Sequence, residues 1–203
     1  MRMDTIDKDC SILLLAGGQG ARMGGRDKGL VPWRGQPLIA HLHRVVRPLT
    51  DDLIISCNRN QSRYASYADQ LVGDGEPGFP GPLAGVLAGL RKARHPWALL
   101  LPCDAPNIDR QLLQSLLAGR ADAARRPLMV RQGEQWQPMF SLLPHCLLQE
   151  LEIAWRRGER SLLRILLAAG ARALDCREDD PRLQNFNTPQ HLDARPCPAA
   201  QAS

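Results

Sequence analysis

The sequence predicts a single α/β domain in which helices flank a mostly parallel central sheet with a small antiparallel element. Short apolar segments alternate with helical patterns along most of the chain, which is typical of βαβ units. The chain has 203 residues, a length that suits one such domain. No internal repeat or linker divides it. We therefore expect one domain over residues 1–194 and a disordered tail over residues 195–203.

The first half of the chain alternates between apolar runs of strand length and helical patterns. The predicted strands are Ser11–Ala16, Leu53–Cys57 and Gln70–Gly73. The predicted helices are Pro37–Val46, Gln61–Tyr67 and Leu83–Ala93. Pro37 suits the first turn of a helix. The glycines and prolines of residues 75–82 predict a loop.

The second half continues this alternation and supplies the antiparallel element. The predicted strands are Trp97–Leu101, Pro127–Arg131, Gln137–Leu142 and Ala171–Cys176. The second and third of these flank a turn at Gly133, so we expect them to pair as antiparallel neighbours. The predicted helices are Arg110–Ala118, Leu147–Arg156 and Ser161–Ala169. Asp109 is expected to cap the first of these helices, and Thr188 a short C-terminal helix.

The composition of the chain indicates which class of molecule it binds and where in the cell we expect it. The net charge is +5, but the cations are spread along the chain and aromatic residues make up only 4% of it. Stacking on nucleic acid needs aromatic side chains, so we expect a polyanionic small molecule instead. No apolar run approaches the roughly 20 residues of a membrane span. The charged start resembles no signal peptide, so we expect a cytoplasmic protein with no membrane partner.

Six cysteines are scattered along the chain without a Cys-x-x-Cys pair. In a chain without an export signal, this arrangement predicts reduced and mostly buried thiols. Cys103 could serve as a nucleophile beside Asp104, but a buried strand cysteine is the favoured interpretation. Trp136 could stack on a ring system or serve as a structural aromatic residue.

A glycine-rich segment follows the first predicted strand and contains three cations. Six glycines fall between Gly17 and Gly29, with Arg22, Arg26 and Lys28 among them. Glycine lets backbone N–H groups approach a ligand, and a run of such groups suits phosphate oxygens. A mobile surface loop would explain the glycines but not the cations. We therefore predict a phosphate-binding loop.

Two common phosphate-binding motifs do not fit this loop. Gly20 and Gly25 have the spacing of a P-loop, but the Lys-Ser/Thr pair that must follow is absent. Gly18 and Gly20 begin a dinucleotide fingerprint, yet Met23 stands where its third glycine is required. The loop therefore matches neither of these two motifs.

Acidic residues follow two further predicted strands. Asp74 follows the third strand, and Asp104 follows a strongly apolar strand between Pro102 and Pro106. In open α/β sheets, ligands bind at the carboxyl ends of the strands. Asp104 is suited to hold Mg²⁺ through one carboxylate, while phosphate oxygens and water complete the coordination. The structural alternative for this aspartate is a turn or helix cap.

Five segments in the same order resemble the molybdenum cofactor guanylyltransferase family of nucleotidyltransferases. The first combines Leu15-Ala16-Gly17-Gly18, Arg22-Met23-Gly24 and Asp27-Lys28-Gly29. The others are Gly81-Pro82-Leu83-Ala84-Gly85, Pro102-Cys103-Asp104-Ala105-Pro106, Gly158-Glu159-Arg160-Ser161 and Asn185-Phe186-Asn187-Thr188-Pro189. The resemblance runs from the first strand almost to the C-terminus. It implies a single-domain, Rossmann-like nucleotidyltransferase fold.

The resemblance also implies a reaction and its partners. GMP would pass from GTP to the terminal phosphate of Mo-molybdopterin, giving molybdopterin guanine dinucleotide and pyrophosphate, with Mg²⁺ as cofactor. Proteins that handle molybdopterin or mature molybdoenzymes would be further partners. The cytidylyltransferases of this pathway tend to carry alanine where this chain has Gly17, and glycine leaves room for a purine. We therefore expect GTP as the nucleotide.

Individual roles follow from the same resemblance. The nucleotide-binding residues would be Leu15, Ala16, Gly17, Lys28, Asp74 and Asp104, of which Asp104 also binds the metal ion. The catalytic residues would be Arg22, Lys28 and Asp104. Candidates for the pterin side are Arg22, Arg160, Asn185 and Asn187. The family often has asparagine near the end of the second strand, where this chain has Ser56 and then Asn58, so either residue is a nucleotide-contact candidate.

Three alternative functions remain open at this point. A molybdenum cofactor cytidylyltransferase would prefer CTP. A sugar-1-phosphate nucleotidyltransferase shares the first loop and the metal aspartate, but usually runs longer and lacks the Asn-x-Asn-Thr-Pro segment. A nucleotide-binding protein without catalytic activity would keep the loop and would not need Asp104.

Overall fold

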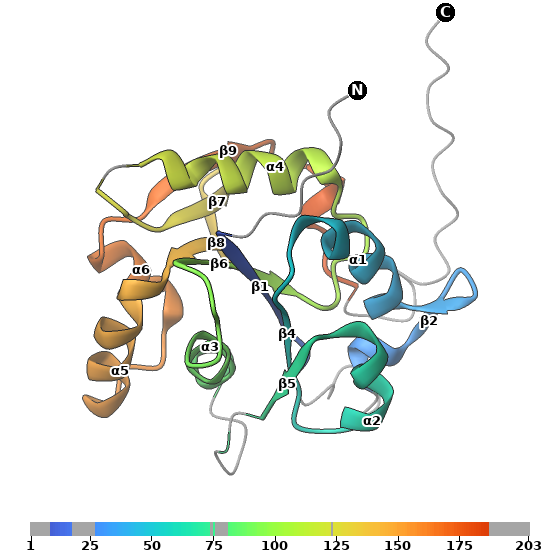
Figure 1. The fold of residues 1–203 in the computed structure, drawn as a ribbon. Helices are drawn as coiled ribbons and strands as arrows, with labels where there is room; N and C mark the ends of the chain where they lie inside the picture. The colour runs from blue at the N-terminus through green and yellow to red at the C-terminus, as the bar shows by residue number, and fades with distance from the viewer. Residues whose placement is uncertain (1–8, 18–26, 74, 76–80, 123, 187–203) are drawn as a thin grey trace, which may run out of the picture.

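The computed structural model describes residues 9–17, 27–73, 75, 81–122 and 124–186. Within them, one seven-stranded sheet has the strand order β5-β4-β1-β6-β8-β7-β9 (Figure 1). Its strands are β1 (Cys10–Leu15), β4 (Leu53–Ser56), β5 (Gln70–Val72), β6 (Trp97–Pro102), β7 (Leu128–Gln132), β8 (Gln135–Pro144) and β9 (Arg172–Cys176). All neighbours are parallel except the two pairs that include β8. The predicted α/β fold and its antiparallel pair around Gly133 are confirmed.

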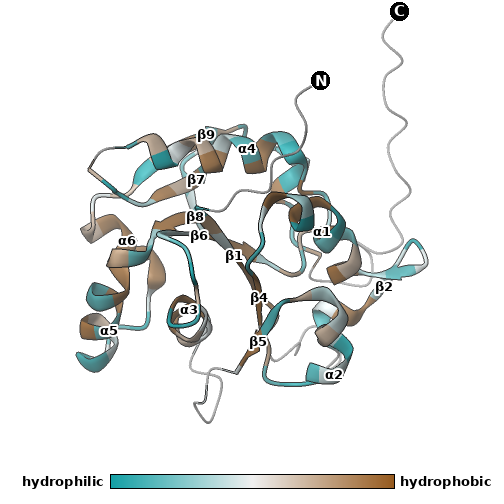
Figure 2. Cartoon of the chain, viewed as in Figure 1, coloured by the Kyte–Doolittle hydropathy of each residue, from teal (hydrophilic) through white to brown (hydrophobic). Residues whose placement is uncertain are grey.

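Helices cover both faces of this sheet, as Figure 1 shows. One core layer packs under α1 (Leu38–Val46), α2 (Gln61–Tyr64) and α4 (Arg110–Ala118). The other packs under α3 (Pro82–Leu90), α5 (Leu148–Arg156) and α6 (Leu162–Ala168). Short 3-10 helices are η2 (Lys28–Leu30), η3 (Arg47–Leu49), η4 (Ala65–Tyr67), η5 (Gly119–Ala121), η6 (His145–Leu147) and η7 (Pro181–Leu183). Figure 2 shows apolar strands between helices whose polar sides face outward, the pattern expected of a two-layered core.

The predicted helices and strands occur wherever the chain is described, with ends that differ by up to three residues. Asp109 Oδ1 accepts a hydrogen bond of 2.8 Å from Leu112 N, which confirms the predicted helix cap. The five described cysteines are free thiols, and Cys10, Cys57 and Cys103 are buried. The predicted C-terminal helix and the tail lie outside the described residues. In the described part, no helix is long and apolar enough to cross a membrane.

A small separate hairpin between η2 and α1 was not predicted. Its strands are β2 (Pro32–Trp33) and β3 (Gln36–Pro37). Each strand has two residues and includes a proline, so neither shows the alternating pattern that reveals a strand in a sequence. The Trp33 ring packs against Leu38 and lies 5.2 Å from the Phe186 ring, measured between centroids. The hairpin is therefore held by long-range contacts.

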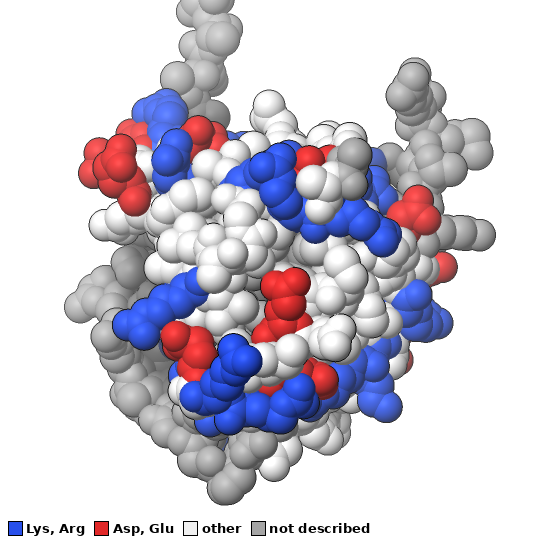
Figure 3. All heavy atoms as spheres, turned by 90° about the vertical axis from the view of Figure 1, so that its left-hand side faces the viewer, with Lys and Arg blue, Asp and Glu red and all other residues white. Residues whose placement is uncertain are grey.

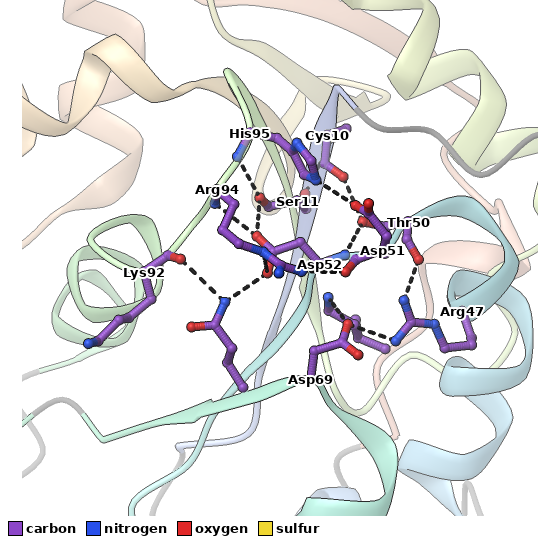
Figure 4. Close-up of polar contacts among 12 residues, drawn as sticks. Cys10, Ser11, Arg47, Thr50, Asp51, Asp52, Asp69, Lys92, Arg94 and His95 are labelled. Carbon is purple, nitrogen blue, oxygen red and sulfur yellow. Dashed lines mark hydrogen bonds and ion pairs between the residues drawn. The ribbon is translucent and has the colours of Figure 1, made fainter.

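Asp52 connects the amino ends of four strands (Figure 4). Its side chain is fully buried. Oδ2 accepts hydrogen bonds from Ser11 Oγ at 2.6 Å and from Arg94 N at 2.9 Å. Oδ1 accepts from Gln70 Nε2 at 2.8 Å and from Arg94 Nε at 3.0 Å. Burial raises the pKa of Asp52, but these hydrogen bonds outweigh it, so the pKa lies below its ordinary value.

Replacing Asp52 with alanine is expected to lower the free energy of unfolding by about 3 kcal/mol, because several buried polar partners lose their acceptor. Asp52→Asn tests the charge alone. Because the folded-state pKa of Asp52 is depressed, its contribution is present at neutral pH and is lost as the pH falls below about 4. Urea titrations between pH 3 and 7 should therefore show a smaller acid-dependent loss in Asp52→Asn than in the wild type. Parallel pH curves would contradict this assignment.

Candidate functional site

Three strands end side by side at the carboxyl edge of the sheet. Ala16 N donates to Ser56 O at 2.8 Å, which joins the ends of β1 and β4. Cys103 N donates to Leu15 O at 3.0 Å, which joins the ends of β6 and β1. The residues that follow these strands, including Gly17, Asn58 and Asp104, therefore emerge at one edge. Parallel strand ends of this kind form the usual ligand site of α/β sheets.

Lys28 and Asp104 meet at this edge although 76 positions separate them in the sequence. Lys28 Nζ lies 3.3 Å from Asp104 Oδ2, and the two side chains are 25% and 11% exposed. The sequence placed one in the glycine loop and the other after a buried strand. The structure brings the two predicted charges together in a partly buried position, where their attraction is screened less than at an open surface.

The residues that position Lys28 were missed by the sequence analysis. Its neighbour Asp27 accepts hydrogen bonds from Tyr64 Oη at 2.5 Å and from Asn60 Nδ2 at 3.0 Å. Tyr64 is fully buried, and burial raises the pKa of its hydroxyl, which stays protonated and donates to Asp27. A Cβ built on Gly29 would lie 2.5 Å from Tyr64 Oη, so a larger residue at this position would have to displace the Tyr64 hydroxyl. A tyrosine in a short helix gives no sequence signal for this contact.

Tyr64→Phe is expected to lower kcat/KM for the nucleotide substrate about tenfold, because Asp27 loses one of the two hydrogen bonds that fix the segment carrying Lys28. Steady-state kinetics with varied nucleotide would measure this. Tyr67→Phe is the matched control, since Tyr67 lies on the adjoining η4 and packs against the His43 ring. Equal kcat/KM values for Tyr64→Phe and the wild type would rule out a positioning role.

The Cys103 side chain cannot act as a ready nucleophile. It is 5% exposed. Burial, together with the negative charges of Asp104 and Asp27, raises its pKa well above the ordinary thiol value. The thiolate is the reactive form, so the neutral thiol is a packing group here. The structural interpretation of Cys103 is thus supported by the geometry.

The two polar candidates after β4 lie in different surroundings. Ser56 is 2% exposed, and a Cβ built on Gly85 of α3 would lie 2.7 Å from Ser56 Oγ. Asn58 follows the strand: a Cβ on Gly17 would lie 4.0 Å from Asn58 Nδ2, and one on Gly73 3.6 Å from Asn58 Oδ1. The Asn58 amide therefore lies beside the start of the glycine loop, whereas Ser56 lies beneath α3.

The C-terminal segment runs beside Asp104. Phe186 N donates to Asp104 O at 2.7 Å. In the preceding residue, the Asn185 side-chain oxygen is buried and accepts no hydrogen bond from the part of the chain that the structure describes. A buried acceptor without a partner is uncommon and marks a position where a ligand group can donate. The backbone at Phe186 therefore joins the segment that contains Asn185 to the segment that contains Asp104.

The remaining predicted residues divide into those that the structure places and those that it does not. Leu15 packs on the α3 side of the sheet, and Ala16 is 8% exposed. Arg160 is exposed in the turn between α5 and α6. Trp136 is half-buried at the start of β8 and packs against the same core as α3, α5 and α6. Arg22, Asp74 and Asn187 lie outside the described residues.

Comparison with known proteins identifies the family. The family model described as MobA-like NTP transferase domain matches residues 12–174. Over 183 residues the chain is 64% identical to the molybdenum cofactor guanylyltransferase of Pseudomonas aeruginosa strain LESB58, covering 90% of this chain and 92% of that protein. The chain belongs to the molybdenum cofactor guanylyltransferase family. It is 63% identical to the Pseudomonas putida F1 guanylyltransferase over 90% of this chain and 95% of that relative.

Solved structures of other proteins share the fold of this guanylyltransferase family member. Molybdopterin-guanine dinucleotide biosynthesis protein A from Archaeoglobus fulgidus matches with a TM-score of 0.72 and 22% identity, over 90% of this chain and 95% of that one. The 4-diphosphocytidyl-2C-methyl-D-erythritol synthase from Anaerococcus prevotii has the same TM-score of 0.72 at 9% identity, over 92% and 93% of the two chains. The chain is thus a nucleotidyltransferase with a Rossmann-like fold, as predicted.

Proposed function

We propose that this protein transfers GMP from GTP to the terminal phosphate of Mo-molybdopterin. An oxygen of that phosphate attacks the α-phosphorus of GTP, and the bond between the α-phosphorus and the bridging oxygen to the β-phosphate breaks. Pyrophosphate leaves with the electron pair. The observation that carries this proposal is the Lys28–Asp104 pair, 3.3 Å apart at the carboxyl edge of a guanylyltransferase sheet.

Lys28 is proposed to bind the phosphates of GTP. Negative charge builds up on the departing pyrophosphate in the transition state, so a cation at this place stabilises the transition state more than bound GTP. Arg22, as a second cation of the glycine loop, is proposed to act on the same phosphates or on the pterin substrate. No nucleophilic side chain is required, because the acceptor phosphate supplies the attacking oxygen.

Asp104 is proposed to hold Mg²⁺. Among the described residues, no group of three or more His, Cys, Asp or Glu side chains is suited to bind a metal ion. A single carboxylate suits Mg²⁺, which commonly takes one or two carboxylates and completes its coordination with phosphate oxygens and water. When bound, Mg²⁺ would neutralise charge on the phosphates. The carboxylate of Asp104 and the ammonium of Lys28 would then face phosphate from two sides.

Guanine is proposed to bind at the first residues of the loop, Leu15, Ala16 and Gly17, with Asp74 as a further nucleotide contact. Of the two polar candidates after β4, the geometry favours Asn58 over the buried Ser56.

Asn58→Ala is expected to raise KM for GTP about tenfold through loss of a buried hydrogen bond. Ser56→Ala should leave KM for GTP within about twofold. A KM change in Ser56→Ala alone would reverse this choice.

Candidates for the pterin side of the site are Arg22, Arg160, Asn185 and Asn187. For Asn185, a buried Oδ1 that accepts no hydrogen bond from the described residues supports this role, because a ring N–H of a pterin is a suitable donor. The direct test of the proposed function supplies the purified protein with Mo-molybdopterin, Mg²⁺ and each of the four nucleoside triphosphates. We expect pyrophosphate release with GTP. We expect no release when the pterin is omitted. Preference for CTP, or activity with a hexose phosphate, would overturn the proposal.

A further inference from the structure

The turn between α5 and α6 is held by its own backbone and by two side chains. Gly158, at φ +88°, ends α5 and donates its N–H to Trp155 O at 3.0 Å. Glu159 Oε1 accepts hydrogen bonds from Arg160 N at 2.8 Å and from Ser161 N at 2.7 Å. Ser161 Oγ accepts from Arg164 N at 3.3 Å and caps α6. The motif Gly158–Ser161 therefore builds a fixed turn.

Arg160 is oriented by Trp155 in this turn. Its guanidinium carbon lies 3.7 Å from the centroid of the Trp155 ring. Its Nη1 donates to Trp155 O at 2.9 Å and to Glu159 O at 3.0 Å, which uses both protons of that nitrogen. Trp155 itself packs against the core under α3, α5 and α6, so the platform below the guanidinium is fixed.

The other edge of the same guanidinium is available for a ligand. Nε and Nη2 of Arg160 make no hydrogen bond to any of the described residues, and the side chain is exposed. These two nitrogens form the parallel pair of donors that binds an oxyanion with two hydrogen bonds. The stacked ring and the two hydrogen bonds of Nη1 already restrict the Arg160 side chain. Ligand binding therefore loses less side-chain conformational entropy.

The position of this turn favours the acceptor substrate over GTP. The connection from β8 through α5 and α6 to β9 leaves from and returns to the amino edge of the sheet, so its middle turn is directed toward the carboxyl edge. Within this helical pair, α5 packs on α3 and α6 packs on β8. Figure 3 views the face with α5 and α6, where Lys and Arg side chains gather along the lower rim. The α5–α6 segment has four exposed arginines: Arg156, Arg157, Arg160 and Arg164.

We propose that Trp155 is a positioning residue that presents the Nε–Nη2 edge of Arg160 to an oxyanion of the acceptor substrate. This inference rests on the proposed function, in which Arg160 belongs to the pterin side. Trp155→Leu keeps an apolar side chain in the core but removes the stacking platform. We expect it to raise KM for Mo-molybdopterin about tenfold while KM for GTP stays unchanged. Trp155→Phe, which retains a ring, should recover most of this loss.

A double-mutant cycle separates positioning from simple destabilisation. In an Arg160→Ala background, Trp155→Leu should cause no further increase in KM for Mo-molybdopterin, because the residue that it positions is already gone. Arg164→Ala is the matched control, because Arg164 is an exposed arginine of the same segment that forms an ion pair with Glu159 at 3.5 Å. Additive effects, an unchanged KM in Trp155→Leu or an equal rise in KM for GTP would overturn the inference. A wild-type protein that transfers no GMP would instead refute the proposed function.

Discussion

Asp104→Asn is expected to lower kcat for guanylyl transfer by on the order of 10³-fold, the scale of loss found when one main electrostatic stabiliser is removed from an active site. The substitution keeps the size of the side chain and removes its charge. Because Asp104 is largely buried beside Lys28, the variant also leaves that ammonium without its carboxylate partner. Single-turnover measurement of pyrophosphate release at saturating GTP and Mg²⁺ reports the chemical step.

The matched control for this variant is Asp179→Asn. Asp179 is an exposed aspartate that forms an ion pair with Arg177 at 2.8 Å and is none of the proposed site residues. Surface pairs of this kind contribute little to stability, so this variant should keep the wild-type rate. Thermal unfolding of both variants checks that each is folded. A loss of less than about tenfold in Asp104→Asn would mean that another group carries the role assigned to Asp104.

Lys28→Met is expected to lower kcat/KM for GTP by about 10²- to 10³-fold. One opposite charge at about 4 Å contributes about 4 kcal/mol at an effective dielectric of about 20, and much of this is lost with the ammonium. Methionine keeps an unbranched apolar side chain in place of the lysine stem. Lys28→Arg should recover part of the activity, because it restores the charge without the compact ammonium geometry.

Lys92→Met provides the control for Lys28→Met. Lys92 follows α3 at the amino edge of the sheet, where its carbonyl oxygen accepts a hydrogen bond from Gln70. Loss of this charge should leave kcat/KM unchanged. If the two lysine variants lost activity equally, the effect would come from net charge and not from contact with the phosphates.

Sequence patterns predicted the fold well because the core is regular. Buried strands such as β6, with six buried residues from Trp97 to Pro102, are apolar throughout, and amphipathic helices such as α4 show their buried face directly. The exception is the β2–β3 hairpin. It is stabilised by Trp33 against Phe186, a contact between distant segments that no local pattern reports.

Site residues could be predicted where the type of side chain alone indicates its chemistry. They were harder to predict where a role depends on how the side chain is oriented in the folded chain. Lys28 and Asp104 were found as a cation among glycines and as an aspartate after a buried strand, and the structure brings them together. Tyr64 was missed because its hydrogen bond to Asp27 spans 37 positions of the sequence. Ser56 and Asn58 were equally plausible from the sequence, since burial under α3 becomes visible only after the chain is folded.

The reversed direction of β8 has a consequence for how substrate range could change in this enzyme. Because β8 runs antiparallel to β6, the β7–β8 turn lies at the carboxyl edge, and β8 then returns the chain to the amino edge before α5 and α6. Residues 133–161, which include the turn that we propose faces the acceptor, thus form one continuous stretch, while β1, β4 and β6 all precede it. Exchanging this stretch between relatives would offer a route to new pterin acceptors with the choice of nucleotide left intact.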